Sequence, residues 1–204
     1  VFTQAAGDRI DPTVTPDPAA AQWVAAGDGR WWLRYPDGSY PANERVVRDG
    51  VTYSFDANGW MKTGWQAEDG AWRYYASSGA MATGWTAVGG TWYYLDPDTG
   101  AMATGWLKDG DTWYYLRSSG AMASGWVNLS GAWFYLNGNG SMATGWANLG
   151  GTWYYLTESG QMAIGWVKDG GSWYFCHPSG AMATGRVVIG GTAYTFDGSG
   201  ALRI

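Results

Sequence analysis

The sequence has few of the residues that build covalent frameworks, catalytic centres or charged interfaces. It contains one cysteine and one histidine, so no internal disulfide can form. Charged residues make up 14% of the 204 positions, and the formal net charge is −5. An acidic chain with few basic residues disfavours nucleic acid or an anionic membrane as the main partner. No apolar run reaches the roughly 18 residues that suggest a membrane-spanning helix.

The same scarcity argues against catalysis. Cys176 and His177 are neighbours in the chain, and adjacent residues of a strand point to opposite faces, so the two do not form a nucleophile–base pair. We interpret them as sequence variation within one repeated unit. No metal-ligand spacing and no phosphate-binding glycine motif occurs in the sequence. We therefore expect no catalytic residue, no metal and no cofactor, and an enzyme would need an activity outside this sequence.

Glycine and aromatic residues are abundant instead, and they recur at a fixed period. A Gly-Trp pair returns about every 20 residues, and a second tryptophan follows the first by seven. The first tryptophans are Trp65, Trp85, Trp106, Trp126, Trp146 and Trp166, and the second ones are Trp72, Trp92, Trp113, Trp133, Trp153 and Trp173. A period this short predicts one small supersecondary unit stacked many times.

Each unit is predicted to be a β-hairpin, which makes the chain an all-β solenoid of stacked hairpin repeats of about 20 residues. Asp109-Gly110 predicts a two-residue turn, and this register places Trp106 directly across from Trp113. The same register is expected for the unit around Asp169-Gly170. Strand alternation then puts Trp113 and Tyr115 on one face. In the other units the glycine comes one residue later, which predicts a longer or bulged loop.

The repeat also predicts the domain organisation. Residues 1–22, rich in proline, alanine and threonine, are interpreted as a linker or the end of an upstream segment. Residues 23–64 are interpreted as degenerate N-terminal repeats, 65–185 as the regular repeats and 186–204 as a C-terminal capping hairpin, because terminal repeats are atypical. The chain begins with Val1 rather than methionine, so we expect it to be a piece of a longer protein.

The aromatic residues carry the functional prediction. A simple interpretation is that the tryptophans are core, but valine, isoleucine and phenylalanine would serve a core as well. Indole has the strongest face for a cation, worth about 0.5–2 kcal/mol per ring. Several such sites on one polymer would add up to tight binding through effective concentration. The same faces could instead stack on sugar rings, so a cation and a carbohydrate both remain candidate ligands.

Residues 105–126, GWLKDGDTWYYLRSSGAMASGW, resemble the cell-wall-binding repeat of choline-binding proteins of Gram-positive bacteria and their phages. The resemblance covers about residues 60–202, with weaker units back to about residue 23. It implies a left-handed superhelix of hairpins in a secreted, cell-wall-associated protein. It also implies a non-catalytic module that anchors a surface protein to choline or phosphocholine on teichoic or lipoteichoic acid. The glucan-binding repeats of glucosyltransferases and clostridial toxins share some elements, so a glucan or wall carbohydrate is the alternative ligand.

The resemblance further implies choline sites between successive hairpins. Each would combine the two tryptophans of one unit with the second aromatic residue of the adjacent aromatic pair in the next unit, which is a tyrosine in every set but one. The implied sets are Trp65, Trp72 and Tyr94; Trp85, Trp92 and Tyr115; Trp106, Trp113 and Tyr135; Trp126, Trp133 and Tyr155; and Trp146, Trp153 and Phe175. The last pair, Trp166 and Trp173, meets Thr195, so this site is expected to lack a third wall. Candidates for a fourth wall are Met81, Met102, Met122, Met142, Met162 and Met182.

Overall fold

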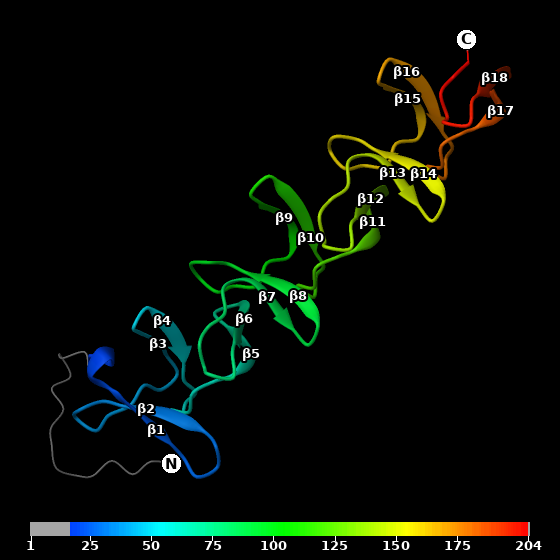
Figure 1. Ribbon diagram of the computed structural model, residues 1–204. Helices are drawn as coiled ribbons and strands as arrows, with labels where there is room; N and C mark the ends of the chain where they lie inside the picture. Colours follow the sequence, from blue (N-terminus) through cyan, green and yellow to red (C-terminus); the bar gives the residue numbers. More distant parts are fainter. Residues whose placement is uncertain (1–16, 204) are drawn as a thin grey trace. The chain divides into compact units, whose positions relative to one another are not determined.

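The computed structural model describes residues 17–203, and the part of the predicted linker at 1–16 lies outside them. The described chain forms nine two-stranded antiparallel sheets, each a hairpin of consecutive strands (Figure 1). A short 3-10 helix, η1 (Pro18–Ala20), precedes them, and the Asp17 side chain accepts a hydrogen bond from the Ala19 amide at its start. The all-β solenoid of hairpins that the repeat predicts is confirmed.

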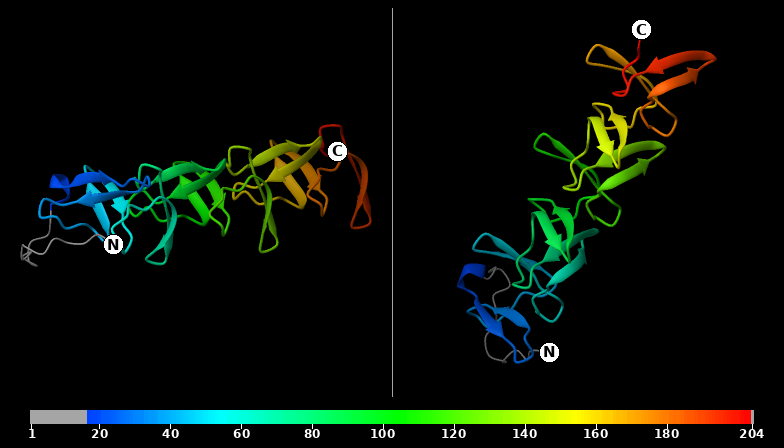
Figure 2. Two further views of the ribbon diagram at one scale, coloured as in Figure 1. Left: turned by 90° about the horizontal axis from the view of Figure 1, so that it is seen from below. Right: turned by 45° about the vertical axis from the view of Figure 1, so that its right-hand side comes forward.

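The chain divides into two compact units, residues 17–103 and 104–203. Within a unit, successive hairpins extend in different directions (Figure 2). The first unit holds β1 (Gln22–Ala25), β2 (Trp31–Arg34), β3 (Arg45–Arg48), β4 (Val51–Ser54), β5 (Gly64–Glu68), β6 (Ala71–Tyr75), β7 (Gly84–Val88) and β8 (Thr91–Leu95). The second holds β9 (Gly105–Asp109), β10 (Thr112–Leu116), β11 (Gly125–Leu129), β12 (Ala132–Leu136), β13 (Gly145–Leu149), β14 (Thr152–Leu156), β15 (Gly165–Asp169), β16 (Ser172–Cys176), β17 (Gly185–Ile189) and β18 (Thr192–Phe196).

The hairpin turns differ from the predicted ones by one residue. Asp109 pairs with Thr112, so the loop is residues 110–111, and Trp106 lies across from Tyr115 rather than from Trp113. The hairpin at 165–176 is shifted in the same way, with Trp166 across from Phe175. Asp109 is the last residue of its strand, whereas Gly110 takes the positive φ of 58° that a tight hairpin turn requires.

The longer loops predicted for the other regular units are also wrong, because each of these has the same two-residue loop. In the hairpin β7–β8, for example, Val88 pairs with Thr91, and Gly89 and Gly90 have φ of 59° and 80°. Positive φ at both central residues gives the turn that matches the twist of paired strands. The predicted sharing of one face nevertheless holds, because the correction moves the register by two residues and a strand has a side-chain period of two.

The core is narrow, and from the hairpin β5–β6 onward it takes one side chain from the end of each hairpin's second strand. These side chains are almost fully buried within their units, with exposed fractions of 0–2%: Tyr75, Leu95, Leu116, Leu136, Leu156, Cys176 and Phe196. Each one also forms a β-bridge with the methionine or leucine of the following connection, such as Leu136 with Met142. Cys176 thus stands where three neighbouring repeats have leucine, and burial raises the pKa of its thiol.

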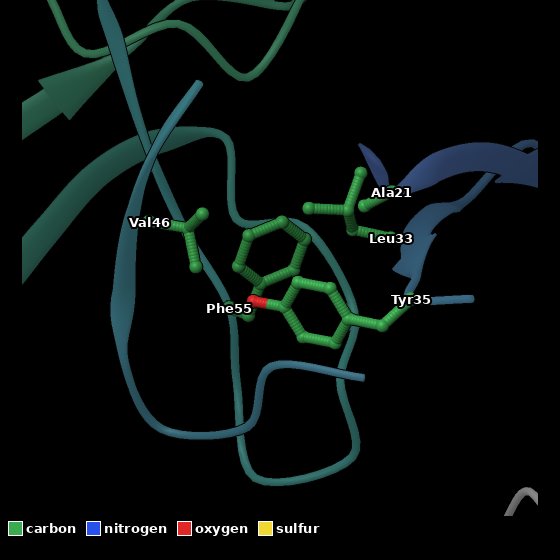
Figure 3. Packing of buried hydrophobic residues seen from close by; sticks show 5 residues of the cluster. All are labelled: Ala21, Leu33, Tyr35, Val46 and Phe55. Atoms are coloured by element: carbon green, nitrogen blue, oxygen red, sulfur yellow. The ribbon is translucent and has the colours of Figure 1, made fainter. Parts of the chain in front are cut away.

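The two hairpins in the segment 23–64 share a small core of their own. Figure 3 shows the side chains of this cluster pointing toward one another from both hairpins and their connections, namely Ala21, Leu33, Tyr35, Val46 and Phe55. Trp23, Tyr53 and Met61 pack against it and are only partly buried. The degenerate sequence therefore keeps the hairpin architecture while it fills the interior with different side chains.

Candidate aromatic cages

The first two walls of each cage come from one hairpin. Trp126 on β11 and Trp133 on β12 lie on the same face because Trp126 pairs with Tyr135 and Trp133 with Asn128. Their ring centroids are 6.3 Å apart and their planes are inclined by 87°. Trp106 with Trp113 and Trp166 with Trp173 have the same separation, with angles of 89° and 90°. Two indoles at right angles form a corner with two π faces.

The third wall is an aromatic residue of the next hairpin, but not the one predicted. Tyr154, the first tyrosine of its pair, lies 4.9 Å from Trp126, centroid to centroid. The predicted Tyr155 lies 5.0 Å from Trp146, the tryptophan of its own hairpin. The two tyrosines are adjacent in a strand and therefore point to opposite faces. One contacts the preceding hairpin and the other contacts its own.

The same correction applies to the other described cages. Their third walls are Tyr93 on Trp65, Phe134 on Trp106, Tyr174 on Trp146 and Tyr194 on Trp166, at 4.8–4.9 Å between centroids. The predicted walls contact the first tryptophan of their own hairpins instead, at 5.0–5.3 Å: Tyr94, Tyr115, Tyr135, Tyr155 and Phe175. Each of these residues packs against the first tryptophan of its own hairpin.

Two predicted sets need a separate account. The set of Trp85, Trp92 and Tyr115 joins residues of both compact units and stays a prediction from the sequence. The set of Trp166 and Trp173 was expected to lack a third wall because its counterpart is Thr195. That expectation is wrong, since Tyr194 lies 4.9 Å from Trp166 and supplies the wall.

The connection after the next hairpin brings a methionine to the second tryptophan of a cage. The Met162 amide donates a hydrogen bond to the Trp133 carbonyl at 2.7 Å. Met162 lines a cavity of about 250 Å³ together with Trp126, Trp133, Tyr154 and Ser179; we call this site the Trp126 cage. The amides of Met102, Met142 and Met182 donate in the same way to the carbonyls of Trp72, Trp113 and Trp153, and Leu202 donates to Trp173.

The other two candidate methionines share the β-bridge and the contact with a turn glycine that other methionines of the series have. The Met81 amide donates to the carbonyl of Thr52, which takes the place of the second tryptophan in its hairpin. Met122 forms a β-bridge with Leu116, and its side chain fills the space beside Gly140 where a Cβ would project. A ligand-contacting role for any of these methionines stays a prediction.

One cage was missed by the sequence analysis. Trp23, Trp31, Tyr53 and Met61 line a cavity of about 320 Å³ with Ser77 and Ser78; we call it the Trp23 cage. Trp23 and Tyr53 are 4.9 Å apart between centroids, and the Met61 amide donates to the Trp31 carbonyl at 2.8 Å. The two tryptophans are eight residues apart because Ala25 pairs with Trp31 across a longer loop. A search for a fixed spacing of seven therefore passes over this site.

The hairpin β3–β4 interrupts the series of cages. Arg45 pairs with Ser54 where a regular hairpin pairs tryptophan with tyrosine, and Thr52 takes the second tryptophan position. On the next hairpin, Arg73 replaces the wall tyrosine and is buried, donating to the Glu68 and Thr99 carbonyls at 2.6 and 2.8 Å. This level therefore has polar groups in place of the three aromatic walls.

Glu68 organises the polar level. Its carboxylate accepts hydrogen bonds from Lys62, Ser54 and Tyr75 at 2.6–2.8 Å. Burial pushes the pKa of Glu68 up, but these three hydrogen bonds outweigh it and hold the pKa below its ordinary value. For Tyr75, burial and the hydrogen bond to Glu68 raise the pKa to about 12. These hydrogen bonds join Glu68, Lys62, Ser54 and Tyr75 into one polar network.

The cages are open to solvent. The second tryptophans of the regular hairpins are 41–50% exposed, although they are the largest apolar side chains present. A tryptophan that served only as core would be covered, and a series of half-exposed apolar side chains marks a surface for interaction. Three π faces around an open cavity can hold a small organic cation or stack on a sugar ring.

Features that would point to other functions are not found in the part of the chain that the structure describes. Residues 17–203 contain no group of three or more His, Cys, Asp or Glu side chains arranged to hold a metal ion. None of the helical structure in this range is long and apolar enough to cross a membrane.

Comparisons with known proteins agree with this geometry. The family model described as a choline-binding repeat matches residues 44–83, 82–125 and 123–164. A second model, described as a putative cell wall binding repeat, matches residues 164–182. No curated protein matches the sequence.

Three solved structures, all from Streptococcus pneumoniae, are similar over most of the chain. CbpJ is 30% identical, with a TM-score of 0.70 over 90% of this chain and 94% of its own. Choline binding protein F, solved with a peptidoglycan analogue, is 37% identical, with a TM-score of 0.75 over 85% of this chain and 70% of its own. The choline-binding domain of CbpL is 31% identical, with a TM-score of 0.64 over 89% of this chain and 96% of its own.

Proposed function

Because the chain belongs to the family of choline-binding repeat proteins, we propose that it anchors a secreted surface protein to the choline-bearing polymers of a Gram-positive cell wall. The observation that carries the proposal is the corner of two perpendicular indoles closed by an aromatic ring of the next hairpin, as in Trp126, Trp133 and Tyr154. The parent protein's own activity would reside outside these repeats, which act as its non-catalytic attachment.

The chemistry of the cage favours a quaternary ammonium group. Choline has no N–H donor on its nitrogen, so it loses little when three ring faces and a methionine replace its water. A primary ammonium would need acceptors, and the Trp126 cavity is lined by three rings, a thioether side chain and one serine. Each ring contributes about 0.5–2 kcal/mol, and three together correspond to a dissociation constant in the millimolar range, about −4 kcal/mol.

Several weak sites on one chain give strong attachment to a polymer. A teichoic or lipoteichoic acid that carries many phosphocholine groups would engage the cages together. Each further contact is then intramolecular and raises the overall affinity by about 10²–10⁴-fold when the spacing fits. Attachment of this kind is reversible, and free choline at high concentration would release the protein.

A wall carbohydrate or glucan is the second candidate ligand. The exposed indole faces favour it, because flat apolar rings also stack on sugars, and the tryptophans are 41–50% exposed. One similar structure, choline binding protein F, was solved in the presence of a tetrasaccharide-pentapeptide. The two candidates differ in what displaces them, since choline would release a choline-bound wall polymer and leave a stacked glycan in place.

Titration of intrinsic tryptophan fluorescence tests the proposal. Choline should give a saturable change in the millimolar range and ethanolamine none. Trp133→Ala should weaken the response, whereas Trp60→Phe should leave it unchanged because Trp60 lies under the Arg30 guanidinium, at 3.8 Å from it, and not among the cage residues described above. No saturable change up to about 100 mM, equivalent to about −1.4 kcal/mol, would refute choline binding, and soluble glucans would be titrated next.

A further inference from the structure

One strand position beside the cages carries opposite charges in different repeats. We call it the turn-entry residue, the last residue of the first strand of each hairpin. Asp169 holds this position in β15 and accepts a hydrogen bond from Trp146 Nε1 at 3.1 Å. Arg48 holds it in β3, and its guanidinium carbon lies 6.0 Å from the centroid of the Trp23 ring. Each of these tryptophans is the first wall of a cage on the preceding hairpin.

On the basis of the proposed function, we propose that the turn-entry residue sets the ligand preference of each cage. The Trp146 cage (Trp146, Trp153 and Tyr174), in which Asp169 accepts the indole N–H of one wall, would favour the choline cation alone. The Trp23 cage, with Arg48 beside it, would favour phosphocholine, which adds an anionic phosphate to the same ammonium. The Trp126 cage has the uncharged Leu149 at the equivalent position and serves as the reference.

The carboxylate of Asp169 acts on the cage in two ways. It places a negative charge next to one wall, which attracts a cation stacked on that wall and repels a phosphate. It also accepts the indole N–H, which adds electron density to the ring that faces the cation. A bound cation lies within about 6 Å of the ring centroid, so the two charges are close enough to interact despite screening at physiological salt.

Arg48 provides the opposite setting. Its Nη1 atom is buried and has no hydrogen-bond partner within the described residues, while its Nε lies 3.5 Å from Asp49 Oδ2. The positive charge of this guanidinium, close to one wall of the cage, repels a bare cation and attracts a phosphate. Ser77 and Ser78 line the same cavity, and a serine hydroxyl can donate to a phosphate oxygen.

Coulomb's law gives the size of the effect. Unit charges about 8 Å apart change a binding constant by about fivefold when the effective dielectric constant is about 40, between the values for a protein surface and for water. The ratio of phosphocholine affinity to choline affinity should therefore be about fivefold higher at the Trp23 cage than at the Trp126 cage. It should be about fivefold lower at the Trp146 cage.

Site-resolved NMR on the full chain tests the proposal. In ¹⁵N-labelled protein, the indole N–H signals of Trp23, Trp126 and Trp146 are assigned through single Trp→Phe variants. Each signal is then followed through separate titrations with choline and with phosphocholine. Asp169→Asn keeps an oxygen that accepts the indole N–H and removes only the charge, so it should bring the Trp146 ratio to that of Trp126. Arg48→Gln should do the same for Trp23.

Matched measurements separate this proposal from its alternatives. Asp111→Asn, the same charge change at an exposed turn residue, should change no ratio. The differences between cages should shrink as salt rises, because the charges are then screened. Ratios equal within twofold at the three cages, or unaffected by the two variants, would overturn the proposal while choline binding itself stands. If no indole signal responds to either ligand, the proposed function fails first.

Discussion

A substitution at Gly180 tests whether the packing of Met162 against this glycine stabilises the contact between neighbouring repeats. Gly180 has φ of +81°, and a Cβ built on it would overlap the Sδ atom of Met162 and lie 2.7 Å from its Cε. Gly180→Ala therefore adds a left-handed residue, at about 1–2 kcal/mol, and overpacks the methionine, at about 1–3 kcal/mol. We expect a loss of about 2–5 kcal/mol in the free energy of unfolding.

Gly171→Ala is the matched control. Gly171 has nearly the same φ, +83°, but nothing lies within 4 Å of its added Cβ, so only the backbone cost of about 1–2 kcal/mol applies. Urea unfolding followed by tryptophan fluorescence gives both values. The double variant Gly180→Ala/Met162→Ala should lose less than the sum of its two single variants, because the shorter side chain removes the overlap.

Equal destabilisation by Gly180→Ala and Gly171→Ala would refute this reasoning. It would mean that Met162 moves aside without cost and does not fix the contact between the repeats. A second readout comes from the cage itself, since Met162 also lines the cavity with Trp126 and Trp133. Gly180→Ala should weaken choline binding at that cage, and Gly171→Ala should not.

Three further predictions concern pH, the core and the third wall. Burial and a hydrogen bond to a carboxylate raise the pKa of Tyr75 from 10.0 to about 12. The stabilisation of the fold by neutral Tyr75, about 2–3 kcal/mol, is therefore complete below pH 10 and lost as pH rises to 12. The urea midpoint should fall over this range, and Tyr75→Phe should remove the part of the fall that ionisation of Tyr75 causes. Cys176→Leu restores the buried side chain of the neighbouring repeats and should raise the free energy of unfolding by about 1 kcal/mol, whereas a lower melting temperature would show that the site has no room. Tyr154→Ala should weaken choline binding at Trp126 by about 2–30-fold, measured from its indole signal, and Tyr154→Phe should not; a larger effect from Tyr155→Ala would reverse the assignment of the wall.

The period of the repeat was enough to predict the hairpin stack and the shared face of the two tryptophans. The register was not predictable from Asp109-Gly110 alone, because this dipeptide is compatible both with a loop of residues 109–110 and with one that begins one residue later. Residue 109 completes its strand and Gly110 opens the loop. The face assignment survived this error because the pairing shifted by two residues, which is the side-chain period of a strand.

The third wall could not be predicted because the two candidates are adjacent and nearly identical. Tyr93 and Tyr94 have the same chemistry, and only the packing of one hairpin on the next determines which of them meets Trp65. The Trp23 cage was missed for a different reason, since its longer loop changes the spacing of its tryptophans. Arg45 can be read from the sequence, but the strand pairing that puts it at the position of a first tryptophan cannot.

The way a cage is built makes the number of cages on the protein depend on the number of repeats that its gene encodes. The Trp126 cage takes two walls from β11–β12, one from β14, Met162 from the following connection and Ser179 from the turn after β16. Three consecutive repeats thus contribute to a single site, and each repeat contributes to up to three sites. Duplication or loss of one in-register repeat by recombination would add or remove one cage and leave the pattern of contacts between repeats unchanged. Under the proposed function, such a lineage would adjust its residence time on the wall in single steps, without evolving a new interface at any of them.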